Sequence, residues 1–122
     1  MKAWLSIQLV VVLLLAGPVW AEPSEKIPAG RVADAIRIAE GIHSRHPYGV
    51  LSVRVSGEAE ARRVCLNSIR NSRQRWEKAG RPGDWLRYFS RRWAPVDNCP
   101  NDPTRLNKNW LKNVRYFLNR SG

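Results

Sequence analysis

The chain has 122 residues, with 21 Lys and Arg against 10 Asp and Glu, and a formal net charge of +11. Its length fits one domain, and a hydrophobic share of 43% is too high for a wholly disordered chain. Two Cys and two His are too few for a four-cysteine zinc site, and no Gly-rich phosphate loop indicates a kinase or nucleotide-driven motor. We therefore expect no metal and no other cofactor.

Residues 1–21 resemble a secretory signal peptide. Lys2 gives a positive start, and the apolar segment that follows is broken by Gly17 and Pro18. We expect cleavage after the small residue Ala21 and a periplasmic or secreted mature chain. The alternative for this segment is a single-pass membrane anchor. Beyond it, no apolar run is long enough to predict an interior membrane span.

An oxidising compartment would allow Cys65 and Cys99 to form a disulfide. The loop that they would close has about 35 residues, which corresponds to roughly 3.8 kcal/mol of stabilisation from chain entropy. Two unpaired, buried thiols are the alternative.

In chain order, residues 22–29 hold two Pro and mixed charges, and we expect a mobile leader before a single domain at 30–122. Apolar residues at helical spacing predict a first helix from Gly30 to Gly41. Residues 42–57 predict a turn-rich loop and a short strand. The apolar stripe of the first helix consists of Val32, Ala35, Ile36 and Ala39.

Three further helices are predicted. The second extends from Glu58 to Ala79, with acidic residues in its first turn. The third has Pro82 in its first turn and ends at Pro95, and the fourth begins with Asp102 as its cap. The fold class is therefore mainly α, with a short extended insert after the first helix. The expected buried faces are Ala61, Cys65, Ile69 and Trp76; Trp85, Leu86, Phe89 and Trp93; and Leu106, Trp110, Val114, Phe117 and Leu118.

Glu40 is the main candidate for chemistry. It lies at the C-terminal end of the first helix, where the helix dipole disfavours a carboxylate, and beside the apolar stripe. Partial burial there would raise its pKa and keep it protonated, as a general acid requires. The alternative is a solvated Glu paired with Arg37 or Arg45.

No second carboxylate is obvious. Asp34 lies on another side of the first helix, whereas Asp97 and Asp102 fall in the loop before the last helix. Each of these two loop residues also has a structural explanation, in a turn or a helix cap. His43 and His46 flank Glu40 but do not match a metal-ligand spacing, so we interpret them as loop residues.

Two tryptophans, Trp93 and Trp110, border a polar loop that ends at Asn109. Aromatic faces beside Asn side chains suit sugar rings, although core packing also explains both tryptophans. The basic helix faces have three interpretations: a solvated surface, attraction to an anionic cell-wall polymer or lipid surface, and nucleic-acid binding. The aromatic residues do not interleave with the basic ones, which weakens the nucleic-acid interpretation.

Several segments resemble a family of small secreted or phage-associated bacterial proteins similar to the lysozyme-like superfamily, particularly the lytic transglycosylases. The segments are AEG, PYGV, CLNSIRNSRQRW, PGDWLRYFSRRWAP and NDPTRLNKNWLKNVRYFL. This resemblance implies a lysozyme-like domain that acts on peptidoglycan, with Glu40 as the catalytic acid, and we expect the chain to be a monomer. It places Tyr48 and Gly49 in the wall of the substrate cleft.

The chain also departs from the transglycosylase pattern. Gly41 stands where many of those enzymes have Ser after the catalytic Glu, and residues 48–51, YGVL, replace their Gly-Leu-Met-Gln segment. The alternative to glycan cleavage is therefore a non-catalytic, cationic exported protein that binds the cell wall or an anionic surface.

Overall fold

The computed structural model describes residues 22–41, 48, 57–96 and 106–121. Within these ranges the protein is mainly α-helical and has no strand, which confirms the mainly α prediction. The predicted short strand falls within residues 49–56, outside the described ranges. The described elements are η1 (Ser24–Lys26), α2 (Ala29–Ala39), α3 (Glu58–Lys78), α4 (Trp85–Trp93), η3 (Leu106–Asn109) and α5 (Trp110–Ser121).

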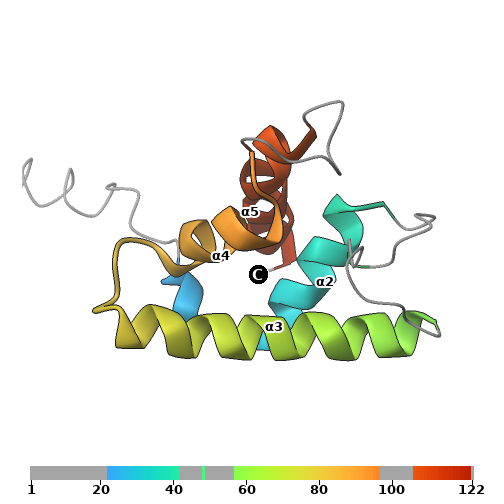
Figure 1. The fold of residues 1–122 in the computed structure, drawn as a ribbon. Coiled ribbons are helices and arrows are strands. Elements are labelled where there is room, and N and C mark those ends of the chain that lie inside the picture. Colours follow the sequence, from blue (N-terminus) through green and yellow to red (C-terminus); the bar gives the residue numbers. More distant parts are fainter. Residues whose placement is uncertain (1–21, 42–47, 49–56, 97–105, 122) are drawn as a thin grey trace, which may run out of the picture.

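The longest helix, α3, lies along one side of the molecule, and α2, α4 and α5 lie on the same side of it (Figure 1). Helix α2 makes its most extensive contacts with α5 and also packs on α3, whereas α4 packs on both α3 and α5. The core therefore lies between α2 and α4, which pack on the long helix α3 on one side and on α5 on the other. None of the described helices has the length and apolar character needed to cross a membrane.

The buried core follows the predicted stripes. Aromatic residues on α4 form a stack, with ring centroids 5.5 Å apart between Trp85 and Phe89 and 5.2 Å apart between Phe89 and Trp93. Their spacing of four residues places them on one helix face, which confirms the prediction for this element. The other core residues include Val32, Ala35, Ile36, Ala61, Cys65, Ile69, Trp76, Val114 and Leu118.

The segment expected to be a mobile leader is instead anchored to the domain. The hydroxyl of Ser24 donates to Asp84 Oδ1 at 2.6 Å and accepts from the backbone N–H of Leu86 at 3.0 Å. Arg73 donates to the carbonyl oxygens of Ser24 and Ile27 at 3.1 and 2.5 Å, and the Ile27 side chain is buried. The composition of this segment, with two Pro and mixed charges, indicated mobility. Composition does not show that Ser24 and Ile27 make contacts with distant parts of the chain.

Helix α4 begins later than predicted. Asp84 is its N-cap residue, accepting the Arg87 backbone N–H at 3.0 Å, so the helix starts at Trp85 and Pro82 lies before it. Gly83 has φ 70°, a left-handed conformation that separates Pro82 from the helix. The predicted start of the last helix at Asp102 lies outside the described residues, and α5 itself begins at Trp110 after one turn of η3.

Candidate functional site

Glu40 occupies the C-cap position of α2. Its backbone N–H donates to the carbonyl oxygen of Ile36 at 2.9 Å, so it still completes the last helical turn. Gly41 follows with φ 93°, a conformation that glycine adopts without strain and that ends the helix. The Glu40 side chain is half-buried, at the rim of the core where the apolar stripe predicted it.

The carboxyl group of Glu40 is held by α5. The indole Nε1 of Trp110 donates a 2.8 Å hydrogen bond to Glu40 Oε1. Only 5% of Trp110 is exposed, and its ring centroid lies 6.0 Å from that of Phe89 on α4. Trp110 is therefore fixed by the core, and it fixes one oxygen of Glu40 in turn.

Burial raises the pKa of Glu40, and the hydrogen bond from Trp110 partly opposes that rise. An indole N–H can only donate, so the oxygen that it contacts, Oε1, acts as an acceptor in both protonation states. The carbonyl oxygen of a protonated carboxyl group is the better acceptor, so this bond favours the acid with its hydrogen on Oε2. Trp110 thus selects which oxygen of Glu40 can release a proton.

Tyr48 lies beside two arginines. Its hydroxyl accepts a 3.2 Å hydrogen bond from Arg62, and the guanidinium groups of Arg37 and Arg62 lie 5.9 and 6.0 Å from its ring centroid. The tyrosine has φ 60° and only 4% exposure. This burial leaves its ring little surface for the sugar that a cleft-wall role would need.

Asp34, a candidate for the second carboxylate, forms an ion pair with Arg62. Arg62 Nη1 lies 2.6 Å from Asp34 Oδ1, and the hydrogen bonds to Tyr48 and Asp34 raise the pKa of Arg62. Asp34 is exposed and already neutralised, so it does not supply a second carboxylate next to Glu40. In the part of the chain that the structure describes, no group of three or more His, Cys, Asp or Glu could hold a metal ion.

Cys65 is a free thiol, which does not agree with the predicted disulfide. It is fully buried on the core face of α3, and burial raises its pKa to about 12. The charge of Arg62 acts against this rise, whereas that of Glu40 adds to it, so all three side chains share one neighbourhood. The predicted partner, Cys99, lies outside the described residues.

The remaining candidates divide into two groups. Trp93 is half-buried at the end of the α4 aromatic stack, and Asn109 is exposed at the end of η3, immediately before Trp110. Both adjoin elements that hold Glu40, although no contact joins either of them to its carboxyl group among the described residues. The candidates that lie outside the described residues are Gly49, Asp97, Asp102, His43 and His46.

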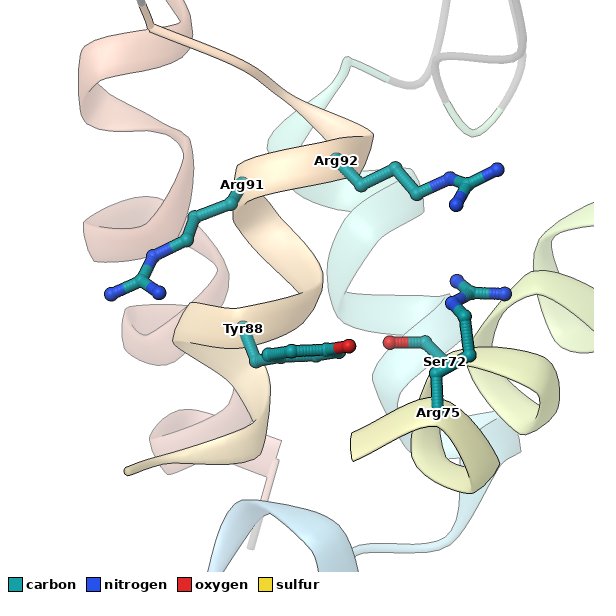
Figure 2. Close-up of a pocket in the computed structure, with 5 residues that line it drawn as sticks. All are labelled: Ser72, Arg75, Tyr88, Arg91 and Arg92. Carbon is teal, nitrogen blue, oxygen red and sulfur yellow. The ribbon is translucent and has the colours of Figure 1, made fainter. Parts of the chain in front are cut away.

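Sequence reasoning missed a cavity between α3 and α4. It has a volume of about 270 Å³ (Figure 2), and Glu40 is not among the residues that line it. The arginines of both helices are visible in the sequence, but there they indicate only basic helix faces and not a shared cavity. The cavity is lined by Ser72, Arg75, Tyr88, Arg91 and Arg92.

Comparisons with protein-family models, with curated proteins and with solved structures found no match for this chain. The chain is therefore assigned to no family. Its function is inferred from the geometry around Glu40 and from the distribution of charge.

Proposed function

We propose that this protein cleaves the glycan strand of peptidoglycan, with Glu40 as the single acid and base. The observation that carries the proposal is the half-buried Glu40 carboxyl group, whose pKa burial raises and whose Oε1 is held by Trp110. A carboxyl group with a raised pKa and a fixed orientation suits general acid catalysis of glycoside cleavage.

In the proposed reaction, protonated Glu40 donates its hydrogen from Oε2 to the glycosidic oxygen as the bond between that oxygen and the anomeric carbon breaks. The resulting carboxylate then takes a proton from the hydroxyl that attacks the anomeric carbon. The attacking group is either the 6-hydroxyl of the same sugar, which gives an anhydro product, or water. The enzyme ends the cycle protonated, as it began.

We favour the intramolecular route. Retaining and inverting glycosidases with two carboxylates place the second one within about 5–10 Å of the acid. Among the described carboxylates, Asp34 is engaged by Arg62 and Asp84 is engaged by Arg115, at 2.7 Å. Attack by the substrate's own hydroxyl needs no second protein carboxylate.

A lysozyme-like arrangement is part of this proposal. Glu40 ends the first helix of the domain and faces the last one, and α2 itself packs on α3. We also propose that the chain acts as a monomer outside the cytoplasm. There the net charge, +10 once cleavage after Ala21 has removed Lys2 from the 21 basic residues, would concentrate it on an anionic wall polymer.

The test is release of soluble muropeptides from purified peptidoglycan, identified by mass spectrometry. Glu40→Gln keeps an oxygen that can accept the Trp110 hydrogen bond but has no acidic proton, so we expect release to fall to background. Glu77→Gln, on the exposed side of α3, is the matched control and keeps full activity. Anhydro products support the intramolecular route, whereas unchanged release by Glu40→Gln would remove this residue from the mechanism.

A second function is favoured by one observation, the exposed arginines of α4: Arg87, Arg91 and Arg92. In this alternative the protein is a cationic exported protein that binds an anionic wall polymer or surface without cleaving it. Sedimentation with purified wall, weakened by salt and accompanied by no muropeptide release, would support this alternative over the first proposal.

A further inference from the structure

The cavity between α3 and α4 is rich in unpaired positive charge. Arg75 comes from α3, and Arg91 and Arg92 come from α4. None of these three side chains forms an ion pair or hydrogen bond with another described residue, and no carboxylate lines the cavity. We call it the arginine cavity.

Several other arginines of the protein form ion pairs with carboxylates. Arg37 pairs with Glu58, Arg62 with Asp34 and Arg115 with Asp84. Each of these pairs joins two elements of the fold, so those arginines have a structural role. Among the described residues the arginines of the cavity have no such partners, and an anion from solution would relieve their mutual repulsion.

Two neutral side chains complete the lining. Ser72 is buried, and its hydroxyl oxygen accepts a 3.2 Å hydrogen bond from the indole of Trp85, which fixes its position. Figure 2 shows the hydroxyl end of Tyr88 pointing toward Ser72 across the cavity. Tyr88 is half-buried, so one part of its ring packs on the core and the rest is available as a flat wall.

The three arginines do not contribute equally. In Figure 2, the guanidinium groups of Arg75 and Arg92 extend on the same side of the cavity, whereas that of Arg91 extends away from Ser72 on the opposite side of α4. An anion that entered between the two helices would therefore meet Arg75 and Arg92 together. Arg91 contributes mainly the apolar part of its side chain to the lining.

We propose that the arginine cavity binds the phosphate ester of a small molecule. Two guanidinium groups match the charge of a phosphate monoester, close to two at neutral pH, better than the single charge of a carboxylate. The Tyr88 ring supplies an apolar wall for the group that carries the phosphate. A volume of about 270 Å³ lies just below the range of ordinary ligand sites, so that group is about one ring in size.

Phenyl phosphate is the probe that tests this proposal, with binding measured by calorimetry at fixed ionic strength. We expect Arg75→Gln and Arg92→Gln each to weaken binding at least about tenfold, because each removes a charge-assisted hydrogen bond. Arg70→Gln, on an exposed position of α3 outside the cavity, is the matched control and leaves binding unchanged. Tyr88→Leu is expected to weaken the binding of phenyl phosphate more than the binding of inorganic phosphate. Benzoate should bind the wild-type protein more weakly than phenyl phosphate does.

Equal weakening by Arg70→Gln would show only general attraction to a basic surface and would overturn the proposal. So would unchanged binding in both cavity variants, or benzoate binding as tightly as phenyl phosphate. Thermal melting of each variant checks that the fold is intact. Because Glu40 does not line the cavity, the Glu40→Gln variant should bind phenyl phosphate as tightly as the wild type. The cavity proposal and the cleavage proposal can therefore fail independently of each other.

Discussion

The indole of Trp110 holds the carboxyl group of Glu40 by a 2.8 Å hydrogen bond that spans 70 positions of the sequence. The bond ties the end of α2 to the first residue of α5, two helices that also make the most extensive contacts in the fold. Packing and the proposed chemistry therefore depend on the same pair of helices. Trp110 is a positioning residue in this scheme, since only Glu40 reaches the substrate.

Trp110→Phe tests this positioning. The hydrogen bond lowers the pKa of Glu40 against the effect of burial, so its removal should raise that pKa further. ¹³C NMR titration of labelled glutamate side chains would measure the shift, and the alkaline limit of glycan cleavage should move to higher pH while the maximal rate falls. Trp93→Phe is the control, because the described residues show no hydrogen bond between Trp93 and Glu40. An unshifted Glu40 titration in Trp110→Phe would contradict the assigned role.

The raised pKa of Glu40 also predicts a pH dependence of stability. Its pKa in the folded state lies above the ordinary value of 4.5, so its favourable contribution is complete below pH 4.5 and is lost as the pH rises through the folded-state value. Glu40→Gln cannot ionise. The difference in the free energy of unfolding in urea should therefore shift in favour of the variant between pH 4.5 and the folded-state pKa and level off above it, and a constant difference across this range would count against the burial effect.

Asp84 should show the opposite behaviour. Burial alone would raise its pKa, but hydrogen bonds from Ser24, Arg115 and the backbone of Arg87 together lower it below 3.8. The resulting stability is present above pH 3.8 and lost as the pH falls through the folded-state pKa. We expect Asp84→Ala to cost about 1–3 kcal/mol of the free energy of unfolding near neutral pH, and to lose this acid dependence.

The matched control for Asp84 is Asp34→Ala, which removes a more exposed carboxylate from a single ion pair with Arg62. Its cost should stay below about 1 kcal/mol, as is typical of surface pairs. Equal costs at the two positions would mean that Asp84 does not join the N-terminal segment, α4 and α5 as the structure indicates.

Cys65 should be inert in the folded protein. It is fully buried and its pKa is raised to about 12, so little thiolate is present near neutral pH. In a Cys99→Ser variant we expect one thiol that reacts with Ellman's reagent in denaturant and not in buffer. The same assay on denatured, unreduced wild-type protein tests the disulfide: two reactive thiols exclude it, and none would show that Cys65 is bonded to Cys99.

The helices were largely predictable from the sequence because their apolar residues recur at helical spacing. That pattern correctly placed Val32 and Ile36 on α2, Ile69 on α3 and Val114 on α5 in the core. It also placed Glu40 at a helix end beside buried residues. These features depend on residues within one or two helical turns of each other, so the local sequence pattern is enough to predict them.

Contacts between distant elements could not be predicted in the same way. The bonds from Ser24 to Asp84 and from Trp110 to Glu40 join residues 60 and 70 positions apart, and no spacing rule connects them. Likewise, Arg75 and Arg92 line one cavity only because α3 and α4 pack together. Periodicity identified the face of each helix but not the helix that it would meet.

The partnership of α2 with α5 has a consequence for synthesis. Helix α2 finds its principal packing partner only after α3, α4 and α5 have been synthesised. Until then, the apolar stripe of α2 is covered only where α3 packs on it. A nascent chain that ends before α5 should therefore leave part of this stripe open to chaperones.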